Sequence, residues 1–425
     1  MNLDARIAIE ALRAGVPNRT AVRLMGNEHS LIEHEFDRAL LRAWVDRPHG
    51  GGRAGTGGAG GGGLGIAGGF GAGKSHLLGY LDEVARGQRF VVSRVTISKE
   101  TPLAHPAAVF AAAARTAVLP DSTDDAIAGC LATLAERPAA LEALEEDLTN
   151  GEEGGFAPLF AAIAFLLRRP ALPPELSRAI ERFLAGGRQP TPLLRQALRE
   201  AGARTRFALG PVDLHTLAFQ RIAFAARLFR AAGYAGWCLL LDEVELIGRY
   251  TPLQRAESYA WLATWLGLDA ARRFPGIVVA YAITDDFTTA VITAREDRER
   301  LPERLRLKGR DAAADLALAA MEHIERTVRD HRLPPPTEGE LDACHARLRR
   351  LYAEAYDWPA PALAPGERTS SRTMRQYIKS WITEWDMDRL LHQTSTIVTE
   401  RLASNYDEDA TLAEPAPDAG GDDAE

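Results

Sequence analysis

Apolar side chains at helical spacing open the chain. They recur between residues 3 and 45 with an interruption at residues 15–18, so we predict a helical N-terminal segment over residues 1–49. The next stretch, residues 50–63, is mostly glycine, which has no side chain to bury and loses much backbone entropy on ordering. We therefore expect a flexible loop there.

Uninterrupted apolar runs mark the strands of a buried sheet. Leu64–Ala67 is a short apolar run, and the longer runs Trp237–Leu241 and Gly276–Ile283 have no polar alternation, which is typical of central strands covered on both faces. The first run is followed by a glycine loop, an amphipathic helix from Lys74 to about Arg86, and a β-rich run at Phe90–Ile97. This order predicts a parallel βαβ unit, and we bound the core at residues 64–310.

Two further regions are predicted to be helical. Residues 104–232 are rich in Ala and Leu, which predicts a large helical insertion within the core. Residues 311–403 are predicted to form a helical C-terminal lid domain, broken at Pro334-Pro335-Pro336 and at 359–365. The fold class is therefore α/β, with a parallel sheet core, a helical insertion and a helical lid. No repeat of fixed period is visible, which argues against a solenoid.

Composition indicates the cellular compartment and argues against secreted and membrane-spanning proteins. Hydrophobic residues make up 46% of the chain and charged residues 25%, as in an ordinary globular protein. The three cysteines, Cys130, Cys238 and Cys344, are far apart, form no metal-binding pair and leave an odd number for disulfides. There is no signal-peptide pattern at the N-terminus and no window of about 18 uncharged apolar residues. We expect a cytoplasmic protein without a membrane partner.

The net charge of −8 is concentrated at the C-terminus. Residues 407–425 hold eight acidic and no basic residues, so we expect a disordered acidic tail at residues 404–425. The body that precedes this tail is neutral overall and has no electrostatic footprint for nucleic acid. Residues 366–402 are basic in places, but Glu384, Asp386 and Asp388 interrupt them. DNA binding is therefore only suggested.

A phosphate-binding loop follows the first predicted strand. Glycines in such a loop let the backbone N–H groups and the start of the next helix surround phosphate oxygens. Lys74 would hold the β- and γ-phosphates, and Ser75 would offer its hydroxyl oxygen to Mg²⁺. The motif G-x-x-x-x-G-K-[ST] is formed by Gly68, Gly69, Phe70, Gly71, Ala72, Gly73, Lys74 and Ser75, and we add the adjacent His76 as a candidate binding residue.

Two acids end the second apolar run. Asp242 and Glu243 follow Trp237–Leu241 directly, at the carboxyl edge of the predicted sheet, where ligands of open α/β folds bind. Asp242 is the candidate magnesium ligand. Glu243 is placed to polarise the water that attacks the γ-phosphate. Glu245 is a weaker candidate that we interpret as a supporting or surface acid.

Further candidates are a sensor and several arginines. Thr284 follows the strand Ile277–Ile283 and could bond the attacking water or the γ-phosphate, with Asp285 as the alternative. A guanidinium would neutralise charge on the transferring phosphoryl group. Arg304 is the candidate for a finger that reaches a neighbouring subunit. Arg372 and Arg375, at a capped helix start, are candidates for a nucleotide contact from the lid.

With these residues in view, the chain resembles the ATP-binding proteins of bacterial BREX phage-resistance systems, a branch of AAA+ ATPases. The resemblance is strongest at Ile9–Arg19, Ile97–Leu103 and Asp242–Glu245, together with the late arginine-containing helix start. It implies that the loop, the acid pair and a lid arginine act on ATP. It also implies work in antiviral defence beside other proteins of the system.

Three functional hypotheses stay open. The first is an ATPase that remodels a protein or DNA complex, as a homo-oligomer with shared sites. The second is a nucleotide-dependent switch with negligible turnover, against which the intact Glu243 argues. The third is a DNA-binding loader, which would need a basic recognition surface or a winged-helix module.

Overall fold

The computed structural model describes most of the chain. The described residues are 2–16, 18–27, 29–45, 63–122, 125–150, 155–169, 172–269, 272, 274–362, 372–392 and 405–412. The predicted flexible loop at 50–63 falls outside them, apart from Gly63, and so do tail residues 413–425.

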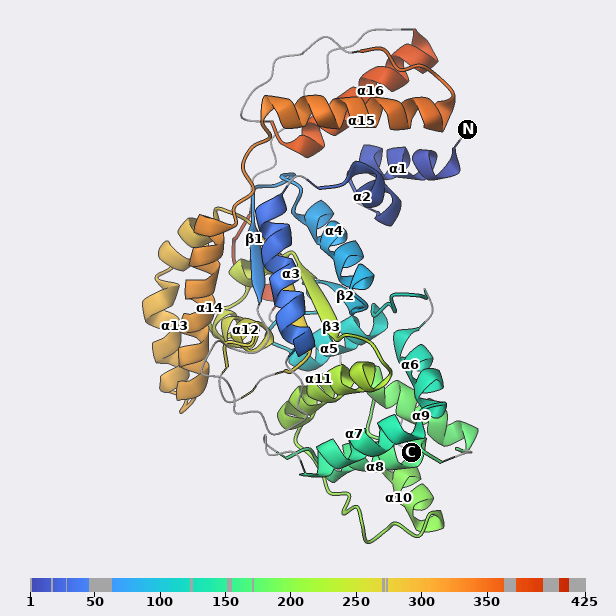
Figure 1. The fold of residues 1–425 in the computed structure, drawn as a ribbon. Helices are drawn as coiled ribbons and strands as arrows, with labels where there is room; N and C mark the ends of the chain where they lie inside the picture. Colours follow the sequence, from blue (N-terminus) through green and yellow to red (C-terminus); the bar gives the residue numbers. More distant parts are fainter. Residues whose placement is uncertain are drawn as a thin grey trace.

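A four-stranded parallel sheet forms the centre of the molecule (Figure 1). Its strands are β1 (Leu64–Ala67), β2 (Val91–Thr96), β3 (Trp237–Asp242) and β4 (Ile277–Ile283), in the order β1-β4-β3-β2. Every pairing is parallel, which confirms the predicted parallel sheet. Because β4 lies between β1 and β3, the end of β4 lies between the phosphate-loop strand and the strand that carries the acid pair.

Successive residues of the central strands face two different hydrophobic layers. On β3, Trp237, Leu239 and Leu241 pack into the larger cluster, while Cys238 and Leu240 pack into the smaller one. The smaller layer is covered by α3 (Ser30–Val45) and α4 (Lys74–Gly87). Both faces are therefore buried, which is why these strands consist of continuous apolar runs.

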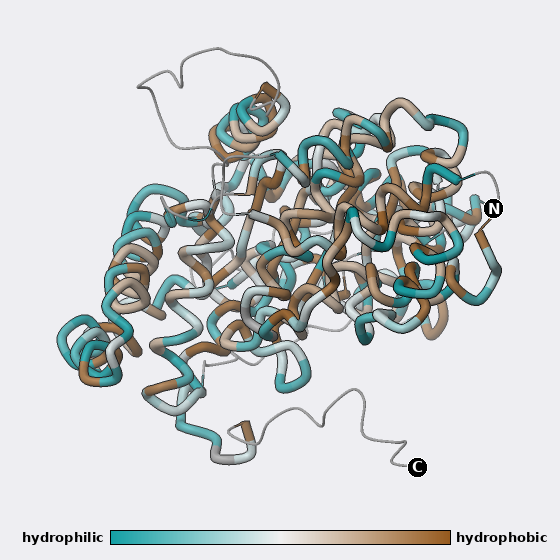
Figure 2. The backbone as a smooth tube through the Cα atoms, turned by 90° about the horizontal axis from the view of Figure 1, so that it is seen from below, coloured by the Kyte–Doolittle hydropathy of each residue, from teal (hydrophilic) through white to brown (hydrophobic). Residues whose placement is uncertain are grey.

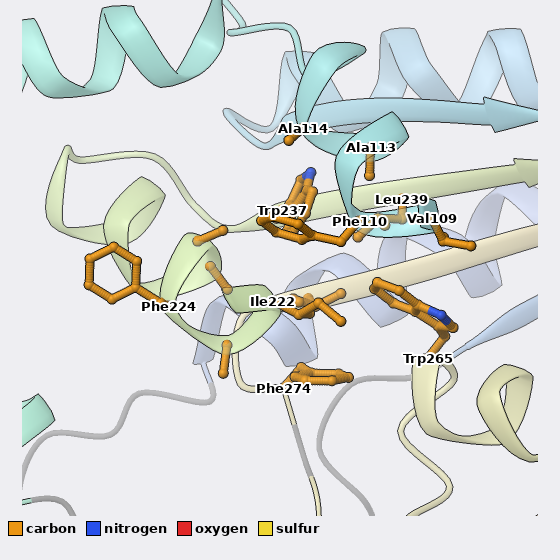
Figure 3. Close-up of a cluster of buried hydrophobic side chains, with 14 of the residues drawn as sticks. Val109, Phe110, Ala113, Ala114, Ile222, Phe224, Trp237, Leu239, Trp265 and Phe274 are labelled. Atoms are coloured by element: carbon orange, nitrogen blue, oxygen red, sulfur yellow. The ribbon is translucent and has the colours of Figure 1, made fainter. Parts of the chain in front are cut away.

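The larger cluster continues into the helices between β2 and β3. Trp237 meets Phe110 of α5 edge to face at a ring-centroid distance of 6.1 Å, and its indole N–H donates to the Ser93 hydroxyl at 2.9 Å. Figure 3 shows Phe110 beside this indole, with Ile222 and Trp265 farther along the same cluster. The helices are α5 (Pro106–Arg115), α6 (Ala126–Ala135), α7 (Pro138–Asn150), α8 (Pro158–Leu167), α9 (Pro174–Leu184), α10 (Thr191–Glu200) and α11 (Leu214–Ala231).

The helices bury one face and expose the other. Figure 2 shows hydrophobic and hydrophilic positions alternating along them, as expected for helices on the surface of a core. Beyond β3 the chain forms η1 (Val244–Arg249), α12 (Pro252–Trp265), η2 (Thr288–Thr293), α13 (Asp297–Arg306) and α14 (Asp311–Asp330). Among the described residues, no helix is long and apolar enough to cross a membrane.

The two ends of the helical chain meet in a separate cluster. The helices α1 (Leu3–Ala14), α2 (Arg19–Met25), α15 (Glu338–Tyr356) and α16 (Met374–Leu391) share buried residues around Tyr352 and Trp385. Figure 1 shows them together at one end of the molecule, opposite α6–α10. The predicted boundaries divide the chain differently, because α14 packs in the core cluster and α1 packs against the C-terminal helices.

A short extended segment adds to the outer edge of β1. Ala67 donates to the carbonyl of His331 at 3.0 Å and accepts from the N–H of Leu333 at 2.7 Å, in a parallel bridge with Arg332. This segment leads from α14 to Pro334-Pro335-Pro336 and then to α15. The edge of the sheet is therefore tied to the start of the C-terminal helices.

The acidic tail differs from the prediction where it is described. Residues 405–412, with a short turn η3 (Ala410–Leu412), lie against η1, α12 and η2 and make ion pairs there. A disordered tail was predicted because the segment is polar and acidic. Its order has a specific physical cause, since arginines of the core pair with its carboxylates.

Candidate functional site

The phosphate loop has the geometry that its sequence requires. The Gly68 N–H donates to the Ile283 carbonyl at 3.1 Å, so the loop begins beside the end of β4. Gly71 and Gly73 have φ values of +75° and +105°, in the left-handed region where glycine is favoured. Gly73 caps α4 without a side-chain hydrogen bond, which leaves the N–H groups of the first turn for an anionic ligand.

Lys74 is held inside this loop. Its side chain is only 9% exposed, and its ammonium donates to the carbonyls of Gly68 at 2.7 Å and Gly69 at 3.3 Å. The same nitrogen lies 4.0 Å from a carboxylate oxygen of Glu245 and 5.6 Å from the centre of the Phe70 ring. A buried cation with weak neutral acceptors and one distant acid is suited to bind a phosphate.

The acid pair ends β3 in a strained conformation. Glu243 has a φ of +61°, unusual for a residue with a side chain, and its N–H donates to the Asp242 carboxylate at 3.0 Å. Burial and the charge of Asp242 raise the pKa of Glu243, while Lys74 and Arg375 oppose that rise. The Glu243 carboxylate is therefore electrostatically coupled to one cation from the loop and one from α16.

Glu245 lies deeper than the sequence suggested. It is 7% exposed, and burial raises its pKa to about 7 against the opposing charge of Lys74. Among the described residues, nothing hydrogen-bonds its buried Oε2 atom. The sequence predicts only a supporting or surface acid at this position, because the burial of Glu245 beside Lys74 depends on the 3₁₀ turn η1 that follows β3.

Thr284 and Asp285 are both engaged by other parts of the chain. Thr284 is 1% exposed, directly follows Ile283, and its hydroxyl is hydrogen-bonded to the Tyr406 hydroxyl. Asp285 forms an ion pair with Arg332 at 2.7 Å. Of the two sensor candidates, Asp285 is committed to the edge segment of the sheet, and Thr284 is the one held by a residue of the tail.

The three candidate arginines have different surroundings. The Arg375 N–H donates to the Gly71 carbonyl at 3.4 Å, and its charge acts on Glu243. Arg372 precedes the N-cap Thr373, and its charge acts on Glu384 of α16 instead. Arg304 is exposed on α13, which Figure 1 shows beside α14 and away from α15 and α16. The structure thus brings Arg375 to the loop and leaves Arg304 on an outer surface.

A pocket adjoins the other side of the loop. It is lined by loop residues 71–73 and by apolar side chains of the α1, α2, α15 and α16 cluster, and its walls include Leu12, Val16, Met25, Met374 and Ile378. The His76 Nε2 lies 2.8 Å from the Gly26 carbonyl, and burial lowers the pKa of His76. The sequence did not reveal this pocket, because its walls come from both ends of the chain and carry no motif.

Two side chains with oxygen atoms stand at the ends of the elements that frame the loop, Ser75 at the start of α4 and Asp242 at the end of β3. Within the described part of the chain there is no group of three or more His, Cys, Asp or Glu side chains arranged to hold a metal ion. Mg²⁺ commonly takes one or two protein oxygens, with phosphates and water supplying the rest. Ser75 and Asp242 would be those two protein ligands.

Comparison with known proteins supports this nucleotide chemistry. No curated protein and no solved structure matches the chain. The family model of the BREX system ATP-binding protein BrxC/D matches residues 58–148 and 203–393, about two thirds of the sequence. These ranges contain the loop, the acid pair, Thr284 and Arg375, and the gap between them contains α8, α9 and α10. The chain therefore belongs to the BREX system ATP-binding protein family, BrxC/D.

Proposed function

We propose that this protein is an AAA+-type ATPase that binds ATP with Mg²⁺ and hydrolyses it in the course of phage defence. The observation that carries the proposal is the buried ammonium of Lys74, held in a glycine loop 4.0 Å from Glu245 and electrostatically coupled to Glu243. Membership of a BREX ATP-binding family supports ATP as the ligand and other defence-system proteins as partners.

The residues divide the work as follows. Lys74 and the N–H groups at the start of α4 bind the β- and γ-phosphates. Ser75 and Asp242 would hold Mg²⁺, which would neutralise charge on the phosphates. Glu243 accepts a hydrogen bond from the attacking water and aligns it with the γ-phosphorus. Thr284 lies at the end of β4, between the loop and the acid pair, and its hydroxyl donates a hydrogen bond to the γ-phosphate.

The apolar pocket beside the loop would take the adenine ring. Leu12, Met25 and Ile378 offer surface for stacking and burial of the base, and His76 braces the pocket by its bond to the Gly26 carbonyl. Since α15 and α16 form the opposite wall, they would act as a lid. Arg375 would contact the γ-phosphate from that lid, and this contact would be lost once the γ-phosphate is removed.

An assembly of several copies is part of the proposal. Arg304 is exposed on α13, and an exposed guanidinium on an outer helix suits contact with the nucleotide of a neighbouring copy. Such an assembly would couple hydrolysis to remodelling of a protein or DNA complex. The alternative is a switch with little turnover, or a DNA-binding loader, and the bond between Thr284 and Tyr406 favours the switch.

The decisive experiment measures ATP hydrolysis and ATP binding by the wild type and by Glu243→Gln, with and without duplex DNA. We expect Glu243→Gln to bind ATP and to lose turnover by roughly 10²- to 10⁴-fold. The exposed Glu200→Gln is the matched control and should behave as wild type. Equal hydrolysis by the wild type and Glu243→Gln under every condition would exclude the enzyme and leave the switch.

A further inference from the structure

The chain's own C-terminal segment packs beside the end of β4. The tail segment, Asn405–Leu412, contacts a set of residues that we call the tail groove: Gly248, Arg249, Arg255, Phe287 and Arg295. Gly248 and Arg249 belong to η1 and Arg255 to α12, while Phe287 precedes η2 and Arg295 follows it. The segment lies beyond the part of the chain that the family model covers.

Aromatic packing and a backbone bond seat Tyr406. Its ring meets Phe287 nearly edge to face, with centroids 5.9 Å apart and planes at 80°. A side chain at Gly248 would place its Cβ only 2.8 Å from the Tyr406 ring, so glycine is needed there. Arg295 donates to the carbonyls of both Gly248 and Tyr406 and thereby joins the groove to the tail segment.

Charge fixes the rest of the segment. Asp409 pairs with Arg249 at 2.8 Å and donates its N–H to the Arg249 carbonyl at 3.1 Å. Glu408 pairs at 2.9 Å with Arg255, which is 3% exposed and is held from behind by two bonds to Asp297. The arginine fork of Arg255 is thus oriented by the core before it meets Glu408, which is the arrangement of a built carboxylate site.

Tyr406 occupies the hydrogen-bond donor of Thr284. The Tyr406 hydroxyl donates a hydrogen bond to the Asp286 carboxylate at 2.8 Å. Its bond with Thr284 must therefore run the other way, with Thr284 as the donor and the Tyr406 oxygen as the acceptor. A threonine hydroxyl has a single proton, and the oxygens of a γ-phosphate only accept. Thr284 cannot serve Tyr406 and a γ-phosphate at the same time.

We propose that the tail groove is a binding site for an acidic peptide with a tyrosine, filled in this chain by residues 405–412, and that its occupation withholds Thr284 from the γ-phosphate. The control part of this inference rests on the role of Thr284 in the proposed function. The seated tail lowers affinity for ATP relative to ADP, since only ATP has the γ-phosphate, and it slows hydrolysis. Release of the tail restores both.

The test uses equilibrium binding of MgATP and MgADP to Glu243→Gln chains, so that turnover does not disturb the measurement. A chain ending at residue 404 should gain about 2- to 12-fold in the ratio of ATP to ADP affinity, the range expected for one hydrogen bond. Tyr406→Phe in the full chain keeps the aromatic packing and the ion pairs, and it should give the same gain. With Glu243 intact, Tyr406→Phe should raise kcat by a similar factor.

A synthetic peptide of residues 403–414 tests the groove itself. Labelled peptide should bind the chain ending at 404 saturably, by fluorescence anisotropy, and should return the affinity ratio to that of the full chain. A Tyr406→Phe peptide should bind without restoring the ratio, and a peptide with Glu408→Lys and Asp409→Lys should not bind. Absence of saturable binding, or binding that leaves the ratio unchanged, would overturn the inference. Absence of hydrolysis by the wild type would reject the proposed ATPase activity but not the tail inference, because nucleotide affinity is measured without turnover.

Discussion

The two sides of the phosphate loop are flanked by groups of opposite character. On one side, α16 brings Arg375 against Gly71, and its positive charge acts on the site. On the other side, Thr284 is surrounded by Tyr406, Asp285 and Asp286, and the tail segment approaches with further carboxylates. The first flank offers the positive charge of Arg375 to a polyphosphate, while on the second the Thr284 hydroxyl is already hydrogen-bonded to Tyr406. The proposed function therefore makes ATP affinity depend on a balance between the charge of Arg375 and the competition of the tail for Thr284.

Removal of the central cation should have the largest effect on this balance. Lys74→Ala deletes the buried ammonium of the glycine loop, and we expect loss of ATP affinity of roughly 10- to 100-fold, as for a hydrogen bond to a charged group. Isothermal titration with MgATP measures it. Lys308→Ala, at an exposed position just after the end of α13, is the control. Unchanged affinity in Lys74→Ala would mean that the loop does not bind phosphate.

The attracting flank can be weakened alone. Arg375→Ala removes a charge next to Gly71 and Glu243, and we expect about a 5-fold loss of ATP affinity, since the side chain is exposed and partly screened. Arg372→Ala should cost less, because the charge of Arg372 acts on Glu384. Titrations at low and high salt should show the difference shrinking as salt rises. A larger loss in Arg372→Ala would reverse our assignment of the lid arginine.

Glu245 makes the site sensitive to pH. Burial raises the pKa of this carboxyl from 4.5 to about 7, so the folded chain keeps a proton that the unfolded chain releases. The stability gained from this protonation is present below about pH 4.5 and is lost as the pH rises through about 7, at up to about 1.4 kcal/mol per pH unit.

Glu245→Gln should remove that dependence. We expect the wild type to lose stability relative to Glu245→Gln between about pH 5 and pH 7, measured as the difference in unfolding midpoint at each pH. Glu200→Gln, at an exposed position, should follow the wild type. Parallel curves for the wild type and Glu245→Gln would show that Glu245 stays ionised beside Lys74.

The smallest expected effect lies at the edge of the sheet. Arg332→Ala leaves Asp285 unpaired beside Gly69, where its charge would repel a phosphate. Because the Arg332 side chain is 60% exposed, we expect no more than about a 2- to 3-fold loss of ATP affinity, and none at high salt. Asp285→Asn in the same background should recover the loss. A loss that persists in the double variant would have a cause other than this charge.

Contiguous signals in the sequence were sufficient for the sheet and the loop. The runs at Leu64–Ala67 and Ile277–Ile283 could be recognised because both faces of these strands are buried, which removes polar alternation. The glycine loop could be placed because its chemistry needs neighbouring residues in a fixed order. These features are local, and local patterns can be read without knowledge of the fold.

The remaining contacts join distant residues and could not be read in this way. Nothing near Tyr406 indicates a bond to Thr284, since the contact depends on Arg249 and Arg295 meeting the tail in three dimensions. The same holds for Glu245, whose depth is set by the turn after β3. The sequence does not show which of Arg372 and Arg375 lies at the loop. The two residues are only three positions apart, and their surroundings differ because of the way the helix packs against the loop.

The position of β1 has a consequence for how the protein is made. This strand ends at Ala67, yet within the described sheet its partners are β4, which begins at Ile277, and the edge segment at residues 331–333. During synthesis β1, which leads into the glycine loop, cannot pair with β4 until more than half of the chain has left the ribosome. Pairings across so long a separation form slowly, and they expose an apolar strand in the meantime. A nascent chain therefore acquires its nucleotide site late, after the helices between β2 and β3 have been synthesised.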